Sequence, residues 1–475
     1  MSETAAMQNI EKALKVNLDP GIYGTIAEIG AGQEVARNFF QAGAAAGTIA
    51  KTMSAYDMQV SDAIYGQEES KRYVTRSRVE KMIDREYNLV LERLAKNKPD
   101  TRFFAFSDTV AAKAFRGKKD CHGWVGIQFQ HEVNALPSQI VLHVRMLDNT
   151  NQMQQKALGV IGVNLIHGAF YLSDKPERLI EGLLDNVSNK RLEVDMINFS
   201  GAAFPEVDNR IMALHLVKKK LSRSVMFNTD GEAVHPADLL YKKSIMLLRG
   251  TFRPVHNIHM DMLNSGIKEI QKDEAFQDEQ TLLLTEISMS KLINKGGVID
   301  SKDFLGRVDT LCKLGYNVQI SNYTRLFRLK EYLANFTQKQ IAIMLGVRKV
   351  YDVFASEYYN DLCGGIYEAV GILFSGNTRL YVYPKLDGYN EILTIDNLRV
   401  EDKMKYLYVH FKENGRILPI TEFNRCILDL NAKTVADDLL IGDDDKWKHK
   451  VPLEVFELIK ERELFGYKSA CRLPE

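Results

Sequence analysis

The sequence has no long apolar run. The roughly eighteen consecutive apolar residues that a membrane-spanning helix needs occur nowhere in the chain of 475 residues. Its first residues, MSETAAMQNIEKALK, are polar and partly acidic, whereas a signal peptide begins with basic residues and continues with apolar ones. We therefore expect a cytoplasmic protein that has no membrane partner.

Neither sign of charge is in excess. Lys plus Arg and Asp plus Glu both number 62, so no net field draws the whole chain to nucleic acid or to an anionic membrane. The strongest basic run, Lys218-Lys219-Lys220, follows a predicted amphipathic helix, where such a run is typical of a solvated helix end. The sequence thus gives no evidence for a nucleic-acid partner.

Cysteine is scarce, and familiar catalytic motifs are missing. The five cysteines are Cys121, Cys312, Cys363, Cys426 and Cys471. None of them lies in a CxxC pair, so neither a disulfide framework nor a zinc site is indicated, and no metal site is predicted. The GxSxG, GxxxxGK[ST] and HExxH motifs are absent as well, which leaves an acyl-transfer nucleophile, a P-loop and a zinc peptidase without support.

From residue 101 onward, short apolar runs alternate with segments of helical length. The predicted strands are RFFAFSDTV, WVGIQFQ, IVLHVRML, LEVDMINFS, SVMFN, SIMLLRG, TLLLTEIS, YNVQIS and QIAIMLG. The predicted helices are 150–171, 176–187, 205–221, 235–243, 256–272, 301–314, 323–335 and 347–360. This alternation predicts an α/β protein with a largely parallel sheet or sheets and flanking helices.

The chain is predicted to contain three regions. Residues 1–100 are mainly helical with one strand-and-glycine interruption, residues 101–390 form the α/β core, and residues 391–475 form a small C-terminal α+β segment. The core can also be divided into two α/β units, 101–243 and 244–390. In the last region Asn414-Gly415 predicts the turn of a β-hairpin.

A first glycine-rich turn lies in TIAEIGAGQEVARNFF, residues 25–40. A short apolar run leads into Gly30-Ala31-Gly32 and then into a helix, a layout that can offer backbone amides to a phosphate or a nucleoside. The turn resembles the first motif of methyltransferases that use S-adenosylmethionine, which implies that Gly30 and Gly32 bind a cofactor. The small residues that follow favour a second interpretation, a helix packed closely against another backbone.

A second turn, RGTFRPVHNIH, spans residues 249–259. It joins a predicted strand to a predicted helix that carries His256 and His259 near its start. The stretch resembles the N-terminal signature of nicotinate-nucleotide adenylyltransferases and their cytidylyltransferase relatives, G-G-T-F-D-P-[IV]-H-x-G-H, with which eight of eleven positions agree. That signature follows the first strand of a Rossmann-like sheet, so the resemblance implies the same placement here.

The resemblance implies transfer of a nucleotidyl group from ATP, with Mg²⁺, to a mononucleotide, and release of pyrophosphate. No covalent enzyme intermediate is needed, so catalysis rests on positioning phosphates and stabilising charge. His256 and His259 would contact the phosphates as the catalytic pair. The residues implied in substrate binding are Gly250, Thr251, Phe252 and Arg253.

The stretch also departs from the family pattern. Arg249 replaces the first glycine, Arg253 replaces the aspartate, and Ile258 replaces the glycine between the histidines. The family's second phosphate motif, I-S-S-T-x-I-R, has two loose echoes here, at 287–293 and 320–326. A structural interpretation therefore stays open, in which His256 packs at a helix start and Pro254 presets the turn.

Polar residues at the ends of other strands suggest a third kind of site. His122, Arg145, Asp148, Asp195 and Asp208 each lie at or near the end of an apolar run, and open α/β sheets bind ligands at such edges. These side chains could serve an enzyme that acts on a small molecule, whereas Asp208 with Arg210 can equally be a salt bridge in the first turn of a helix.

A non-catalytic function is a further alternative. In that interpretation the α/β core and the N-terminal helices build a homo-oligomer, and the polar groups listed above serve packing. The sequence leaves this alternative and both enzyme hypotheses open.

Overall fold

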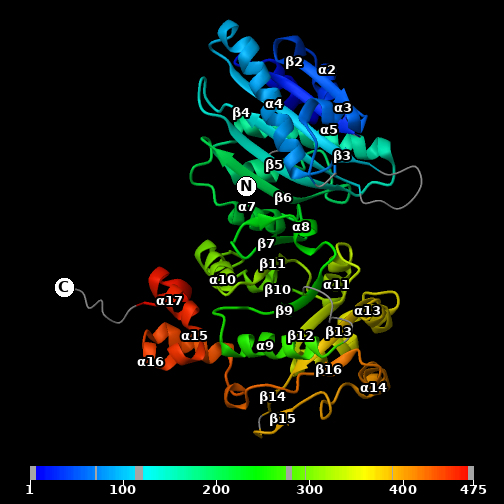
Figure 1. Cartoon of the computed structure of the whole chain (residues 1–475), viewed down its shortest axis with the longest axis vertical. Coiled ribbons are helices and arrows are strands. Elements are labelled where there is room, and N and C mark those ends of the chain that lie inside the picture. The colour runs from blue at the N-terminus through cyan, green and yellow to red at the C-terminus, as the bar shows by residue number, and fades with distance from the viewer. Residues whose placement is uncertain are drawn as a thin grey trace, which may run out of the picture. The chain divides into compact units, whose positions relative to one another are not determined.

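The computed structural model describes residues 7–30, 32–69, 72–112, 121–273, 281–294, 296–387 and 389–468. It consists of two compact units, Met1–Arg223 and Ser224–Glu475, hereafter unit 1 and unit 2. The sequence predicts divisions near residues 100, 243 and 390, whereas the units of the structure divide between Arg223 and Ser224. The predicted α/β class is confirmed, since each unit is a sheet with flanking helices (Figure 1).

Unit 1 contains a six-stranded sheet in the order β2-β1-β3-β4-β5-β6. The strands are β1 (Ile22–Gly30), β2 (Ile49–Ala55), β3 (Arg102–Ala111), β4 (His122–Phe129), β5 (Ser138–Met146) and β6 (Leu192–Gly201). The pairs of β1 with β2 and β3 are parallel, whereas β3 to β6 are antiparallel. Among the described residues between β3, β4 and β5 there is no helix, and a parallel pair needs such a crossover. The first hundred residues thus supply two strands of this sheet as well as helices.

The helices of unit 1 follow the apolar patterns of the sequence. They are α1 (Asn9–Asn17), α2 (Val35–Ala42), α3 (Met58–Tyr65), α4 (Arg76–Leu94), α5 (Asn151–Tyr171), α6 (Pro176–Gly182) and α7 (Asn209–Lys218). The buried face of α4 includes Val79 and Ile83, which pack with Trp124 and Val141 of the sheet. Thr75 caps this helix through the amide of Arg78, which satisfies one of the amides left unpaired at a helix start.

Unit 2 contains an eight-stranded sheet in the order β16-β13-β12-β9-β10-β11-β7-β8. The strands are β7 (Ser224–Phe227), β8 (Ala233–Val234), β9 (Ser244–Arg249), β10 (Thr281–Ser288), β11 (Asn317–Ser321), β12 (Ile341–Gly346), β13 (Thr378–Tyr383) and β16 (Ile417–Pro419). The six strands from β9 onward are parallel, and β7 and β8 pair antiparallel at one edge. A separate small ribbon pairs β14 (Lys385–Leu386) with β15 (Ile392–Leu393).

The six parallel strands have the strand order of a dinucleotide-binding fold. Numbered along the chain from β9, they lie in the order 3-2-1-4-5-6, which is the Rossmann arrangement. Their residues are apolar along the whole strand, as in SIMLLR of β9, because both faces of a parallel sheet are covered by helices. The turn after β9 is therefore the turn after the first strand of a Rossmann-like sheet.

The helices of unit 2 connect these strands and form the C-terminal part of the unit. They are α8 (Pro236–Leu240), α9 (Asn257–Gln271), α10 (Ser301–Lys313), α11 (Leu326–Ala334), α12 (Val347–Phe354), α13 (Gly365–Leu373), α14 (Lys405–Glu413), α15 (Ala432–Ile441), α16 (Asp444–Trp447) and α17 (Leu453–Arg462). The core between helices and sheet includes Leu247, Ile343 and Leu380, each fully buried. None of the helices that the structure describes is long and apolar enough to cross a membrane.

The hairpin predicted at Asn414-Gly415 is wrong, because these residues end a helix. Residues 405–413 form α14, Asn414 is its C-cap, and Gly415 has a φ of +64°. The amide of Arg416 donates to the carbonyl of Phe411 at 2.9 Å, and that of Gly415 donates to Lys412 at 3.1 Å. This pair of hydrogen bonds is a Schellman motif, in which glycine has the same conformational advantage as in a hairpin turn.

Candidate functional site

The RGTFRPVHNIH stretch lies at the topological switch point of unit 2. β9 ends at Arg249, and α9 begins at Asn257. β9 pairs with β10 on one side and with β12 on the other, so the chain leaves β9 toward one edge of the sheet and later returns to extend the other. Open parallel sheets bind ligands in the crevice outside the carboxyl ends of such strands.

The two histidines form a stacked pair at the start of α9. Their ring centroids lie 3.8 Å apart, and the backbone N–H of His256 donates to Nδ1 of His259 at 3.2 Å. The Phe252 ring also packs against His259, with a centroid distance of 4.8 Å. Because Nδ1 of His259 accepts a hydrogen bond, the proton of the neutral ring resides on Nε2, which makes this atom a donor.

Burial keeps both imidazoles uncharged at neutral pH. It lowers the pKa of His256 to about 4. The pKa of His259 lies well below its ordinary value, mainly through burial and then through the neighbouring His256. Within the described part of the chain, Nδ1 of His256 is buried and makes no hydrogen bond. The pair can therefore offer hydrogen bonds to a ligand but no charge.

The glycine of the turn is required by the phenylalanine that follows it. Phe252 is fully buried and has a φ of +47°, in the left-handed region. Its ring folds back over Gly250, so that a β-carbon on Gly250 would lie 2.7 Å from the ring. The amide of Gly250 donates to the carbonyl of Glu286, and Arg307 donates to the carbonyl of Thr251, each at 3.0 Å. The turn is thus fixed by its own neighbours.

Arg249, at the end of β9, contacts groups at the ends of the parallel strands β10 and β11. Its Nε lies 2.5 Å from the fully buried Glu286 of β10, and its other nitrogens donate to the carbonyls of Tyr323 and Thr324. Ser321 of β11 donates to the second oxygen of Glu286 at 2.6 Å. Burial raises the pKa of Glu286, and the Arg249 charge opposes that rise. Arg249 is therefore part of the structure beneath the turn.

Arg253 is also paired with a protein carboxylate. Its Nε lies 2.5 Å from Asp303 at the start of α10, and Arg307 contacts the other oxygen of the same carboxylate at 2.5 Å. The Arg253 side chain remains 45% exposed. Neither arginine that departs from the family pattern is thus without a carboxylate partner.

The resemblance also implies a second phosphate motif. Both echoes found in the sequence begin in the last residues of parallel strands of unit 2, one in β10 and one in β11, and continue beyond them. Arg325 of the second echo is paired with Asp361 at 2.6 Å. A further segment near the site, residues 420–425 (ITEFNR), follows β16. Thr421 there donates to Glu269 of α9, and the amide of Asn424 donates to Asp261 of α9. This segment therefore lies along the helix that carries the two histidines.

Two further cations lie at the carboxyl ends of β12 and β13. Arg348 is in the first turn of α12, which directly follows β12, and Lys385 follows β13. Burial lowers the pKa of Lys385, and the positive charge of Arg348 lowers it further. Within the residues that the structure describes, neither side chain has a carboxylate as ion-pair partner. β12 is the neighbour of β9 at the switch point, so these charges lie on the same edge of the sheet as the histidines.

A pocket of about 710 Å³ in unit 2 lies at the opposite end of α9. Its lining includes Glu269, Asp273, Arg379 and Tyr381. The Asp273 carboxylate is bonded to Arg379 and to the hydroxyl of Tyr381. About ten residues of helix, roughly 15 Å, separate Glu269 of this pocket from His259, so the pocket is not part of the switch-point site.

In unit 1, the turn that contains Gly30 and Gly32 packs against side chains of the protein itself. Gly30 has a φ of +78°, and a β-carbon on Gly32 would collide with the carboxylate of Asp108. The first amides of α2, those of Val35 and Ala36, donate to the carboxylate of Glu28 at 3.0 and 3.2 Å. A cofactor phosphate would need those same amides, so the geometry favours the packing interpretation of this turn.

Glu28 and Asp108 form a buried acidic pair beneath that turn. They are register partners on the parallel strands β1 and β3, and their side chains are 3% and 1% exposed. Burial raises the pKa of both carboxyl groups, and the charge of Glu28 adds to the rise at Asp108. Each of two adjacent buried carboxylates disfavours the charged form of the other, which agrees with the raised pKa of both groups.

Three of the strand-end residues of unit 1, Arg145, Asp148 and Asp208, lie in separate ion pairs. His122 and Arg145 are direct neighbours across β4 and β5, and Arg145 lies 3.1 Å from Glu193. Asp148 pairs with Arg191 at 2.8 Å. Asp208 caps α7 and pairs with Arg210 at 2.7 Å, as in the salt-bridge interpretation. His122 and Arg145 are therefore brought together, while Asp148 and Asp208 are engaged elsewhere.

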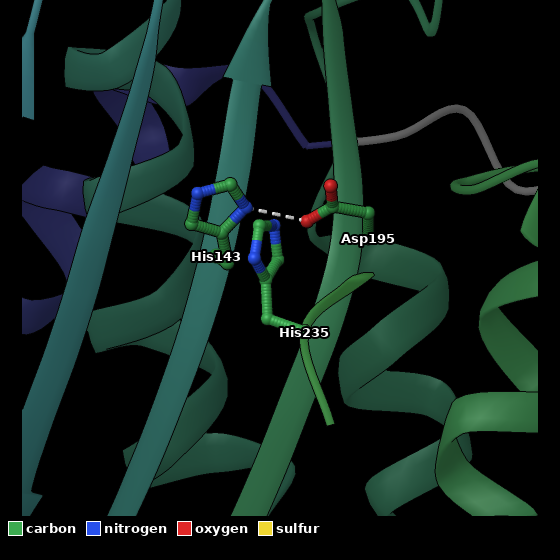
Figure 2. A group of neighbouring side chains, drawn as sticks. All are labelled: His143, Asp195 and His235. Atoms are coloured by element: carbon green, nitrogen blue, oxygen red, sulfur yellow. Dashed lines mark hydrogen bonds and ion pairs between the residues drawn. The ribbon is translucent and has the colours of Figure 1, made fainter. Parts of the chain in front are cut away.

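Asp195 instead contacts a histidine that sequence reasoning overlooked. Oδ1 of Asp195 lies 2.6 Å from Nδ1 of His143, as the dashed line in Figure 2 shows. The other ring nitrogen of His143, Nε2, lies 3.0 Å from Nδ1 of His122. His235, also drawn in Figure 2, belongs to unit 2, where it caps α8. The alternation of IVLHVRML places His143 and Arg145 on one face of β5, and this was the available signal.

Comparisons with known proteins identify no family for the chain. No protein-family model matches the sequence, and no curated protein matches it. Among solved structures, the competence/damage inducible protein CihA from Agrobacterium tumefaciens is similar at 16% identity and a TM-score of 0.26, covering 36% of this chain and 99% of that one. A CinA superfamily protein from Klebsiella pneumoniae is similar at 12% identity and a TM-score of 0.26, covering 34% of this chain and 96% of that one. A CinA superfamily protein from Escherichia coli is similar at 14% identity and a TM-score of 0.25, covering 35% of this chain and 92% of that one. At these TM-scores the likeness supports no statement about fold or function.

Proposed function

We propose that unit 2 binds a nucleotide at the carboxyl ends of β9 and β12 and transfers a nucleotidyl group from ATP to a mononucleotide. The observation that carries this proposal is the place of the RGTFRPVHNIH stretch. It follows the first of six parallel strands in the order 3-2-1-4-5-6, where nucleotides bind in folds of this kind and where the resembling family has its signature.

In this proposal the two histidines position phosphate oxygens. Nε2–H of His259 donates to a phosphate oxygen at the start of α9, where the positive end of the helix dipole favours an anion. The lowered pKa values of His256 and His259 keep the imidazoles neutral, so they orient the phosphates without supplying charge. An oxygen of the mononucleotide phosphate attacks the α-phosphorus of ATP, and the bond to pyrophosphate breaks.

The positive charge for the triphosphate comes from other groups. Arg348 and Lys385 lie at the adjacent strand ends and repel one another, an arrangement that an anion between or beside them would stabilise. Mg²⁺ would arrive bound to the phosphates, because the carboxylates nearest the turn, Glu286 and Asp303, are already paired with arginines. Mg²⁺ usually takes substrate phosphates and water as most of its ligands.

The test is pyrophosphate release by the full chain. The protein is incubated with ATP, Mg²⁺ and nicotinate or nicotinamide mononucleotide, beside the variants His259→Ala and Lys385→Ala and the matched control His410→Ala, an exposed histidine on α14. We expect both site variants to lose at least tenfold in rate and the control to match the parent. Pyrophosphate release no higher than in His259→Ala would contradict the proposal.

Self-association through the N-terminal helices is a second candidate function. On α1 and directly after it, Ile10, Leu14 and Leu18 follow one another at four-residue steps and are 44%, 36% and 63% exposed. An apolar stripe of this kind is typical of a helix that packs against a partner. A mass measurement in dilute solution tests it: a dimer that Leu14→Glu converts to a monomer supports this candidate, and a monomeric parent contradicts it.

A further inference from the structure

Unit 1 contains a second constellation of ligating side chains, which the proposed function of unit 2 does not use. It consists of His122 on β4, His143 on β5 and Asp195 on β6, three neighbouring strands of one sheet. We propose that His122 and His143 bind a divalent transition-metal ion of the Zn²⁺ type, with Asp195 orienting His143. This proposal is independent of nucleotide binding in unit 2.

The distances fit a metal between the two rings. Nδ1 of His122 and Nε2 of His143 lie 3.0 Å apart. In tetrahedral Zn²⁺ sites each nitrogen lies about 2.0–2.1 Å from the metal, so two nitrogen ligands are separated by about 3.3 Å. A separation larger by a few tenths of an ångström, with the His122 proton on Nε2 and the lone pairs of both facing nitrogens directed at the ion, would therefore convert the hydrogen-bonded pair into a ligand pair.

Asp195 fixes which nitrogen of His143 faces the metal. Its carboxylate lies 2.6 Å from Nδ1 of His143, so that nitrogen carries the proton and Nε2 presents its lone pair toward His122. Metal-binding histidines almost always donate their second ring nitrogen to a carboxylate or a carbonyl in this way. The arrangement around His143 is thus that of a metal ligand with its supporting carboxylate (Figure 2).

A bulge in β6 places the carboxylate. His143 pairs with Met196 and the next residue, Val144, pairs with Val194, so Asp195 is the extra residue of β6. Bulges redirect side chains and occur frequently beside functional sites. Regular pairing would have aimed Asp195 at the opposite face from His143, because side chains alternate along a strand.

The surroundings of His143 include an aromatic ring. Trp124, directly opposite His143 on β4, packs its ring edge against the imidazole at a centroid distance of 4.9 Å. His143 and Asp195 are 1% and 3% exposed, whereas His122 is only partly buried.

The donor types indicate which metal fits. Two imidazoles suit Zn²⁺, Cu²⁺ or Ni²⁺ better than Ca²⁺ or Mg²⁺, which prefer oxygen ligands. With two protein nitrogens on the ion, the remaining positions would be taken by water or another small ligand. Such a bound water is acidified by Zn²⁺ and can act as a nucleophile near neutral pH.

The experiment titrates metal into the full chain. Protein stripped with a chelator is titrated with Zn²⁺ by calorimetry and with Co²⁺, whose visible absorption reports tetrahedral nitrogen coordination. The variants are His122→Gln, His143→Gln and Asp195→Asn, and His131→Gln serves as the control histidine of unit 1. Circular dichroism and thermal unfolding show whether each variant is folded.

We expect one equivalent of metal in the parent and in the control. The two histidine variants should lose binding and the Co²⁺ absorption, and Asp195→Asn should bind 10- to 100-fold more weakly. No binding by the parent, or binding that His122→Gln and His143→Gln leave unchanged, would overturn the proposal and leave the three residues as a structural hydrogen-bond chain. The outcome does not depend on whether unit 2 transfers nucleotidyl groups.

Discussion

Each unit contains a close pair of histidines, and the two pairs have different partners. In unit 2 the rings of His256 and His259 stack, His259 contacts Phe252, and neither histidine has a carboxylate as hydrogen-bond partner within the described residues. In unit 1, His143 lies between His122 and the carboxylate of Asp195. A buried imidazole without a carboxylate stays neutral and can only donate or accept hydrogen bonds. An imidazole held by a carboxylate has a fixed tautomer and an enhanced tendency to bind a cation.

The two sheets explain where each pair lies. The parallel strands of unit 2 bring strand ends together at one edge, so its polar groups collect in the turns that follow β9, β10 and β12. The antiparallel strands β4 to β6 of unit 1 instead place polar residues side by side on one face. Sites of the first kind depend on turns and helix starts, and those of the second kind depend on register.

The largest effect is expected when Arg249 is removed. Arg249→Ala leaves the fully buried Glu286 without its charged partner, and breaking such a buried pair costs about 3–5 kcal/mol of unfolding free energy. Denaturant unfolding at neutral pH measures this loss. The double variant Arg249→Met/Glu286→Gln should recover much of it, and a single variant as stable as the parent would show that this pair does not support the turn.

The next effect is a pH dependence that arises in unit 2. The pKa of His256 is about 4 when folded and about 6.5 when unfolded, so the unfolded chain binds more protons between these values. Stability from this group is therefore complete above pH 6.5 and falls as the pH drops toward 4, by roughly 3 kcal/mol. Unfolding curves at several pH values should show that His256→Gln has a shallower slope than the parent. An equal slope would contradict the burial of a neutral His256.

A smaller effect of opposite sign is expected from the acidic pair of unit 1. The pKa of Asp108 is raised well above 3.8 by burial and by Glu28. The folded chain therefore holds its proton to higher pH than the unfolded chain, and stability falls as the pH rises through that window. Asp108→Asn removes the ionisation and should stabilise the protein at pH 8 by on the order of 1 kcal/mol. A marked loss of stability would instead indicate that the ionised carboxylate has a cation partner.

The smallest effect is expected at Arg253. Its ion pair with Asp303 is 45% exposed on the arginine side, and pairs of this kind contribute about 0–1 kcal/mol. Arg253→Ala should therefore change the unfolding free energy by less than about 1 kcal/mol. If it also abolished pyrophosphate release, Arg253 would have to contact the substrate, as the family resemblance implies.

Much of unit 2 could be predicted from the sequence. The strand SIMLLRG and the helix at 256–272 correspond to β9 and to α9 at 257–271, because continuous apolar runs and helical periodicity are local signals. The strand order was not predictable, since it depends on pairing between residues far apart in the chain. Without it the place of RGTFRPVHNIH in its sheet could not be judged.

The site in unit 1 was harder to predict. Asp195 was recognised as a polar residue in an apolar strand, but regular alternation would place it on the other face from its eventual partner. Only the bulge opposite His143 and Val144 brings Asp195 to His143, and the sequence has no clear signal for a bulge there. The Asn414-Gly415 prediction failed for a related reason, because one dipeptide fits both a hairpin turn and a helix end.

The most direct measurement is a crystal structure of the full chain with a non-hydrolysable ATP analogue and Mg²⁺. The account predicts triphosphate density at the start of α9, within hydrogen-bond distance of Nε2 of His259 and near Arg348 and Lys385. Density for the nucleotide at any other place, or an unchanged turn at saturating analogue, would contradict the proposed function of unit 2.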